Sequence, residues 1–345
     1  MGKISAICSG IVITVTVAVM TAWAMLAIYY SDILNETLRA CCAGLFGLAT
    51  VCGFITLPNR RRTLLCFLAL FAVVAVWWSS IKPSNNRDWQ TDVAVLPYAS
   101  IQGNLVTIHN IRNFNYRTET DFNARYYDKM FDISKLTSVD LITVYWMGDA
   151  IAHVMISFGF GGSDFVTFSI ETRKAKGQEY SSIKGFFKQY GLICIAGDER
   201  DLIRVRTSFR NPQEDVYLYR IRATPERARQ FFMEYVKMIN DLRETPEFYN
   251  TLTTNCTTSI ITLIRAFSGD VSYSWKILLS GYAAQYAYEL GRMDTALPFS
   301  ELRRLSYINK RASESINDPD FSQKIRAGLP DPNHLVTGSS GSVIH

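Results

Sequence analysis

The hydrophobic residues of this chain follow two different patterns that meet near Lys82. Before that point, three long apolar runs cover residues 4–30, 38–57 and 63–81. Arg39, at the start of the second run, is the one charged residue within them. Each run is close to the ~20 residues that a helix needs to cross a bilayer. Because charges inside membrane helices usually mark transport or proton relays, residues 1–82 are predicted to form a three-helix membrane anchor.

Charges in the connecting segments predict the orientation of this anchor. Lys3 precedes the first run, the basic cluster 60–62 separates the second from the third, and the loop 31–36 carries two acids and no base. Basic segments stay on the cytoplasmic side. We therefore expect a multi-pass membrane protein with a cytoplasmic N-terminus and a C-terminal domain outside the cytoplasm.

The first run has an alternative interpretation. Ala22-Trp23-Ala24 resembles a signal-peptidase cleavage site, which would make the run a removable signal peptide. The run has only one preceding lysine and continues past this site, so an uncleaved helix is favoured. In either case the second and third helices place the following domain outside the cytoplasm.

After the anchor, the sequence predicts a polar linker at 83–92, an α+β domain at 93–327 and a disordered tail at 328–345. Two β-prone runs, 153–160 and 165–172, are joined by two glycines and predict a β-hairpin. Further β-prone runs predict strands at 104–111, 139–145, 192–195 and 215–222.

Two helices are predicted in the second half of this domain. Thr224 followed by Pro225 is typical of a helix start, and apolar residues then recur at helical spacing as far as Leu242. The second helix is expected to begin at Cys256 and to end at Gly269.

Charge and cysteine content exclude some classes of function. The formal net charge is +5 over 345 residues, without the dense basic stripe that a nucleic-acid partner requires. Five of the seven cysteines lie in or beside the apolar runs, so only Cys194 and Cys256 belong to the soluble domain. No C-x-x-C pair indicates zinc, and neither a metal nor a cofactor is expected.

Cys256 is the candidate nucleophile. It stands where a polar loop becomes an apolar-faced helix, and the unpaired N–H groups of a helix start stabilise a thiolate and can bind an oxyanion. Asn255 and Thr257 flank the thiol and are expected to support the site and its oxyanion contacts.

A nucleophilic thiol needs a base, usually a histidine. Two of the four histidines lie in the predicted tail, which leaves His109 and His153. His153 begins the predicted hairpin and is favoured as the base. Glu171, on the returning strand, is the first candidate for the group that orients the imidazole, with Asp149 and His109 as weaker candidates.

Five short motifs, taken in order, resemble the Lnb N-terminal periplasmic domain family. They are YRTETDF at 116–122, Ala-His at 152–153, SIETR at 169–173, YNTLTTNCTT at 249–258 and LLSGY at 278–282. The resemblance covers roughly residues 88–329. The family is similar to permuted papain-like thiol enzymes of the lecithin–retinol acyltransferase group, in which a strand histidine precedes an Asn-Cys helix start.

The resemblance implies a permuted papain-like domain with an antiparallel sheet and packed helices, and a bacterial inner-membrane protein in which this domain is periplasmic. It also implies a cysteine-dependent acyltransferase or acyl hydrolase that works through a thioester, on a membrane lipid or lipoprotein substrate. Two other functions stay open: a thiol amidase or peptidase acting on envelope peptides, and a non-catalytic envelope scaffold.

Each candidate residue also has a purely structural interpretation. Cys256 could be a core cysteine or could form a disulfide with Cys194 in an oxidising periplasm. Glu171 could form a surface ion pair with Arg173 or Lys174. His153 alone could be a satisfied structural histidine.

Overall fold

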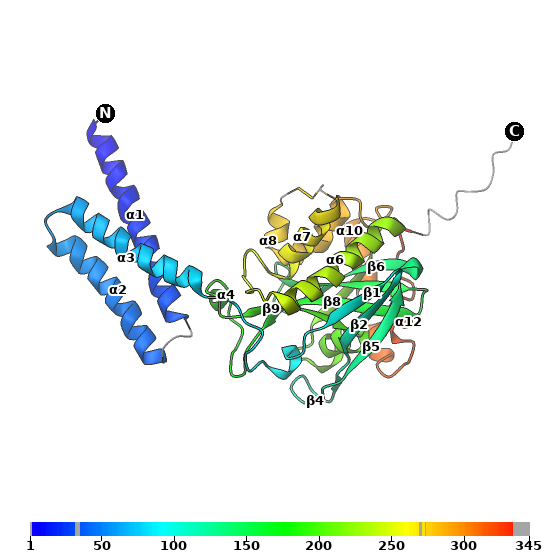
Figure 1. The fold of residues 1–345 in the computed structure, drawn as a ribbon. Helices are drawn as coiled ribbons and strands as arrows, with labels where there is room; N and C mark the ends of the chain where they lie inside the picture. The colour runs from blue at the N-terminus through cyan, green and yellow to red at the C-terminus, as the bar shows by residue number, and fades with distance from the viewer. Residues whose placement is uncertain (1, 32–34, 269–270, 273, 334–345) are drawn as a thin grey trace. The chain divides into compact units, whose positions relative to one another are not determined.

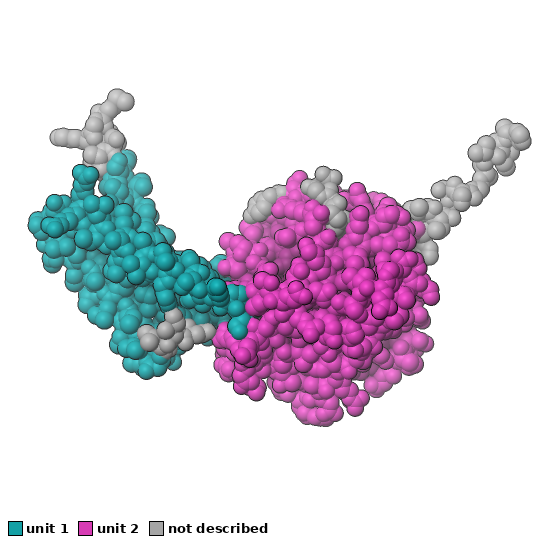
Figure 2. All heavy atoms as spheres, viewed as in Figure 1, with its two compact units in different colours: residues 1–84, 180–191 teal, residues 85–179, 192–345 magenta. Residues whose placement is uncertain are grey.

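The computed structural model describes residues 2–31, 35–268, 271–272 and 274–333. Residues 334–345 of the predicted tail, and Gly269 as the predicted helix end, lie outside these ranges. The chain forms two compact units, which Figure 2 shows in different colours. The first comprises Met1–Ser84 with Tyr180–Gly191, and the second comprises Asn85–Glu179 with Leu192–His345.

The first unit is built from three long helices and one short one (Figure 1). They are α1 (Gly2–Tyr29), α2 (Glu36–Thr56), α3 (Arg60–Ser80) and α4 (Ser182–Gly185). The long helices confirm the three predicted runs, and all three are long and apolar enough to cross a membrane. Asn35 and Asn59 cap α2 and α3 by accepting hydrogen bonds from backbone N–H groups of the first turn.

The second unit is organised around an eight-stranded, mostly antiparallel sheet. Its strand order is β1-β2-β9-β8-β7-β6-β10, and β5 pairs with β2. The strands are β1 (Tyr98–Gln102), β2 (Leu105–Arg112), β5 (Tyr126–Asp132), β6 (Leu136–Tyr145), β7 (Ala152–Phe160), β8 (Asp164–Arg173), β9 (Gly191–Gly197) and β10 (Asp215–Arg220). A separate small hairpin pairs β3 (Asn115–Tyr116) with β4 (Phe122–Asn123).

The predicted hairpin is confirmed as β7 and β8. Gly161 and Gly162 both adopt positive φ at its turn, 58° and 81°, which glycine accepts without the steric cost that a side chain would bring. The register runs from Phe160 opposite Asp164 to Met155 opposite Ser169. The pairing ends there, so His153 and Glu171 lie where the two strands separate.

Helices cover the sheet on both faces, as expected for an α+β domain. α6 (Pro225–Glu244) packs on β1 and β6, and α7 (Cys256–Ser268) packs on β7 and β8 (Figure 1). The opposite face is covered by α5, α11 and α12, whose apolar side chains form one core with Ile142 and Met155. The remaining helices are α5 (Glu199–Leu202), α8 (Trp275–Leu278), α9 (Ala283–Glu289), α10 (Phe299–Ser306), α11 (Asn309–Glu314) and α12 (Phe321–Lys324).

Helix α6 begins as the sequence predicts. The Thr224 hydroxyl accepts a hydrogen bond from the backbone N–H of Arg227, and Pro225 occupies the first helical position. The aromatic residues on its inner face pack around Phe158 of β7. This packing fixes β7 under α6 and thereby places the strand that carries His153.

Candidate active site

Cys256 is the first residue of α7, and the residue before it builds the helix start. The Asn255 side-chain oxygen accepts hydrogen bonds from the backbone N–H groups of Thr257 and Thr258, both at 2.9 Å. The Asn255 amide nitrogen donates to the carbonyl oxygen of Thr251 at 2.8 Å. Asn255 is therefore the N-cap of α7, and it fixes the position of the thiol that follows.

This cap changes the expected oxyanion contacts. The sequence suggested that several N–H groups of the helix start would be available to an oxyanion. The N–H groups of Thr257 and Thr258 are instead occupied by the Asn255 side chain. Among the donors of the first turn, the backbone N–H of Cys256 itself is left as the candidate oxyanion donor.

His153, Ser169 and Glu171 form a short chain of hydrogen bonds between β7 and β8. His153 Nε2 lies 2.7 Å from the Ser169 hydroxyl, which donates to Glu171 Oε1 at 2.7 Å. The direct separation of His153 Nε2 and Glu171 Oε1 is 3.1 Å. Since the hydroxyl gives its proton to the carboxylate, its oxygen accepts the proton of Nε2. In the neutral imidazole the other ring nitrogen, Nδ1, is thereby left without a proton, so it is the nitrogen that can accept one from the thiol.

Arg206 completes the surroundings of Glu171. Its guanidinium donates to Glu171 Oε1 at 2.9 Å and is 3% exposed. It belongs to a π-helical turn, Val205–Phe209. Burial of this cation is compensated by Glu171 and by Glu214, which lies 4.0 Å from it.

The electrostatics of the site are those of an interacting thiol and imidazole. Burial raises the pKa of the Cys256 thiol, but contact with His153 and hydrogen bonds from the Val154 backbone and the Thr257 hydroxyl outweigh burial and lower it. Burial lowers the pKa of His153, yet the Glu171 carboxylate and the Cys256 thiol raise it to about 9. Both shifts favour a thiolate beside an imidazolium.

Glu171 stays ionised in this setting. Burial alone would raise the pKa of its carboxyl group, but the charges of His153 and Arg206 and the Ser169 hydroxyl hold the pKa well below its ordinary value. The structure therefore brings Cys256, His153 and Glu171 together, with Asn255 and Thr257 beside the thiol.

The remaining candidates lie elsewhere. His109 Nδ1 is 2.7 Å from Asp128, and its ring stacks on Tyr98. Asp149 pairs with Arg303 at 2.6 Å. Cys194 is buried and, like Cys256, is a free thiol, so the alternative disulfide is not formed. Arg173 donates to backbone carbonyls and to an asparagine, so the ion partners of Glu171 are His153 and Arg206.

The LLSGY motif supports the histidine strand. The Ser280 hydroxyl accepts a hydrogen bond from the backbone N–H of Ala152 at 3.0 Å, and the Tyr145 hydroxyl donates to the carbonyl of Gly281 at 2.7 Å. A Cβ atom on Gly281 would lie 2.0 Å from the carbonyl oxygen of Asp149. Only glycine allows this approach, which fixes the strand just before His153.

Sequence reasoning missed Ser169 and Arg206. Ser169 could have been found, because residues two apart on a strand face the same side and Ser169 precedes Glu171 by two. Arg206 gives no such signal: it is 35 residues from Glu171 in sequence, and only the fold brings them together.

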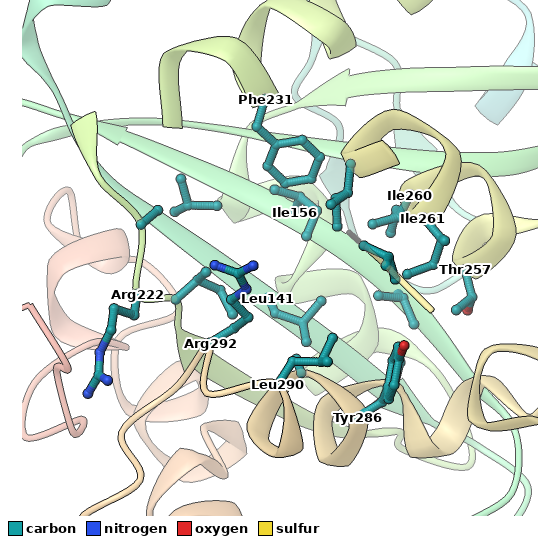
Figure 3. Close-up of a pocket in the computed structure, with 18 of the residues that line it drawn as sticks. Leu141, Ile156, Arg222, Phe231, Thr257, Ile260, Ile261, Tyr286, Leu290 and Arg292 are labelled. Atoms are coloured by element: carbon teal, nitrogen blue, oxygen red, sulfur yellow. The ribbon is translucent and has the colours of Figure 1, made fainter. Parts of the chain in front are cut away.

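An apolar cavity of about 150 Å³ lies beside the site. Val154 and Thr257, the sequence neighbours of His153 and Cys256, line it, whereas His153 and Cys256 themselves are not among its lining residues. Figure 3 shows Ile260 and Ile261 of α7 beside Thr257, with Tyr286 and Leu290 across the cavity. Its lining is mainly apolar, and Arg222, Arg292 and Lys276 also line it.

Taken together, these features define a class: a membrane-helix protein whose second unit is an α+β domain with a Cys–His–Glu cluster at a helix start. Residues 122–281 match the family model described as the Lnb N-terminal periplasmic domain. This match confirms, over residues 122–281, the resemblance that the motifs predicted. This match and the three apolar helices indicate a membrane protein of the cell envelope. Searches of the curated proteins and of the solved structures find no match.

Proposed function

We propose that this protein is a cysteine-dependent acyltransferase or acyl hydrolase that acts on lipid or lipoprotein substrates. The observation that carries the proposal is the joint presence of a thiol–imidazole–carboxylate cluster and a mainly apolar cavity along the helix that begins with the thiol. The cluster supplies the nucleophile and base. The cavity offers an acyl chain a place next to them.

The proposed membrane arrangement follows the charge pattern of the sequence. α1, α2 and α3 cross the inner membrane, with the N-terminus and the basic cluster 60–62 in the cytoplasm and the second unit in the periplasm. An enzyme attached to the bilayer meets lipid substrates at a high effective concentration. The anchor therefore suits a substrate that is itself held in the membrane.

The first half-reaction forms a thioester. His153 Nδ1 takes the thiol proton, and the Cys256 thiolate attacks the carbonyl carbon of the acyl ester. The negative charge that develops on the carbonyl oxygen is met by the backbone N–H of Cys256. When the tetrahedral intermediate collapses, the carbon–oxygen bond to the alcohol breaks, and the His153 imidazolium returns its proton to that alcohol.

The second half-reaction releases the acyl group. An amine or a water molecule gives a proton to His153 as it attacks the thioester carbonyl. The carbon–sulfur bond then breaks and leaves an amide or a free acid, and the thiol regains its proton. Glu171 and Ser169 hold the imidazole through its Nε2 in both halves, which leaves Nδ1 to exchange the proton.

The test is capture of the acyl-enzyme. The full chain, reconstituted in nanodiscs, is given radiolabelled phospholipid and a long-chain activated ester, and the modified peptide is identified by mass spectrometry. We expect a hydroxylamine-sensitive acyl adduct on Cys256 that is absent from Cys256→Ala and strongly reduced in His153→Ala.

Other outcomes identify the alternatives. Release of fragments from envelope peptides without any lipid-derived adduct would establish a thiol amidase or peptidase on the same cluster. A Cys256→Ser variant that keeps the full function in cells, together with an unlabelled wild type, would establish a scaffold.

A further inference from the structure

The loop between β8 and β9 belongs to the membrane-helix unit by its contacts. Residues Tyr180–Gly191 cluster with the three long helices and not with the sheet that they interrupt. The loop contains the short helix α4. Phe187, Lys188 and Gln189 contact the ends of α1 and α3 and so fix the position of the loop against these helices.

Lys188 makes the most contacts between the loop and α3. Its ammonium donates to the carbonyl oxygens of Trp78 at 3.0 Å, Ser79 at 3.4 Å and Ile81 at 3.2 Å. It also lies 4.3 Å from the centre of the Trp78 ring. A cation at the C-terminal end of a helix is stabilised by the unpaired carbonyl groups and by the helix dipole. Lys188 reaches this position from a left-handed backbone conformation, φ 56°, which is uncommon for a residue with a side chain.

A second tie reaches α1. The Phe187 ring stacks on Tyr30 with ring centres 5.6 Å apart, and the Gln189 amide donates to the Tyr30 carbonyl. The loop is thus joined to the ends of two different helices. Its position relative to the helix bundle is set by these contacts.

The depth of the loop follows from the length of α3. This helix has 21 residues, so at ~1.5 Å per residue it is roughly 31 Å long, close to the ~30 Å hydrocarbon core of a bilayer. When α3 spans the membrane, its last turn lies at the interface, where tryptophans such as Trp77 and Trp78 are favoured. Lys188 contacts that last turn directly, which puts the loop at the same depth.

At this depth the loop exposes large apolar side chains. Tyr180 is 50% exposed, Ile183 52% and Phe186 40%, whereas Phe187 and Tyr190 are buried against the helix ends and within the loop. In water this arrangement would leave apolar area unburied at a cost of about 25 cal/mol per Å². Beside the end of a spanning helix, the lipid interface is the environment that removes that cost.

We propose that the loop 180–191 is a second membrane-contacting element, which places Tyr180, Ile183 and Phe186 among the lipid headgroups and upper acyl chains at the end of α3. The occupant of this surface is the bilayer itself. The proposal rests on the proposed membrane placement of α3 and not on the proposed chemistry of Cys256. Because the loop continues directly into β9, it gives the second unit a membrane attachment in addition to the segment after α3.

The test is photo-crosslinking to lipid in the intact protein. p-Benzoylphenylalanine replaces Ile183 or Phe186 in the full chain carrying Cys256→Ala, reconstituted in nanodiscs of phosphatidylethanolamine and phosphatidylglycerol. Matched controls carry the same group at Val73 in α3, which is 65% exposed, and at Ile101 in β1, which is 50% exposed. Lipid adducts are measured by mass spectrometry of the protein and its peptides.

We expect lipid adducts at positions 183 and 186 with a yield close to that at 73 and several-fold above that at 101. If position 73 forms adducts but positions 183 and 186 form no more than position 101, the loop proposal is overturned and the membrane placement of α3 stands. Absence of adducts at 73 as well would overturn the placement of α3 and the loop proposal with it. Crosslinks at 183 to a second copy of the chain in place of lipid would also overturn it.

Discussion

The Ser169 hydroxyl lies 2.7 Å from His153 Nε2 and decides which nitrogen of the imidazole carries the proton. Because the hydroxyl donates to Glu171, it accepts from Nε2, and in the neutral imidazole this leaves Nδ1 as the basic nitrogen. Ser169 therefore shares the orientation of the imidazole, a role that the sequence suggested for the Glu171 carboxylate alone. The direct 3.1 Å contact of Glu171 with His153 adds to it.

Ser169→Ala should weaken this orientation without abolishing it. One hydrogen bond contributes about 1 kcal/mol, so we expect acylation of Cys256 to slow by about tenfold or less. The matched control is Thr167→Val, two residues away on the same face of β8, where the buried hydroxyl has no hydrogen-bond partner among the described residues. Equal acylation rates in the two variants would show that the serine plays no orienting part.

Removing the charge of Glu171 should have a larger effect. Glu171→Gln takes away the main group that raises the His153 pKa, so the imidazole becomes a weaker base and loses its fixed orientation. We expect acylation to slow by about 10²-fold, the low end of the range for general-base effects. The control is Asp149→Asn, which removes a carboxylate that pairs with Arg303 outside the site. A Glu171→Gln protein as fast as Asp149→Asn would contradict the assignment.

The reactivity of the thiol should depend on pH in a way that reports its partner. In the wild type, His153 lowers the Cys256 pKa against the opposing effect of burial. In His153→Ala, burial still raises the Cys256 pKa, and only the weaker hydrogen bonds from Val154 and Thr257 remain to lower it. The midpoint of alkylation against pH should therefore move upward, which means slower reaction at neutral pH and recovery at high pH. Iodoacetamide alkylation rates, read at the Cys256 peptide by mass spectrometry, measure this. A midpoint that does not move would show that the two groups are not coupled.

The local patterns of the sequence predicted the elements that carry the site, because each depends on neighbouring residues. The β7–β8 hairpin follows from β-prone runs around two glycines, and the start of α7 follows from Asn255 before an apolar stripe. The use of the first-turn N–H groups by Asn255 is equally local, but it required geometry to recognise.

Long-range charge pairing could not be predicted in the same way. Arg326 is buried with Asp140 and Glu199, 186 and 127 residues away in sequence. Arg206 reaches Glu171 by the same kind of non-local packing. Such pairs satisfy each other only once the fold exists, so no window of sequence contains the information.

The apolar cavity predicts a preference for long acyl chains. Ile261 lies on α7 and lines the cavity, so Ile261→Trp should fill space that an acyl chain would use. We expect kcat/KM for long-chain activated esters to fall by about tenfold, as lost burial of a few methylenes at ~0.8 kcal/mol each implies, while short-chain esters react as before. Leu252→Trp is the control, since Leu252 is 49% exposed and does not line the cavity. Equal losses for both chain lengths would argue against an acyl site here.

Gly281 should be intolerant of even the smallest side chain. A Cβ atom there would lie 2.0 Å from the Asp149 carbonyl oxygen and 2.7 Å from the Ala150 carbonyl carbon. Both are backbone atoms, so the contact can be relieved only by moving the segment that leads into His153. Overpacking of this kind costs about 1–3 kcal/mol, and we expect Gly281→Ala to lower both the unfolding temperature and the acylation rate.

Ser280→Ala separates the two effects. It removes the hydrogen bond to the Ala152 N–H without adding volume, so its cost should be about 1 kcal/mol and its acylation rate should stay closer to the wild type. Thermal unfolding of the full chain in nanodiscs, followed alongside acyl-adduct formation, compares the two variants. If Gly281→Ala unfolds and reacts like the wild type, then the close approach of this turn to the strand before His153 is not what positions the histidine.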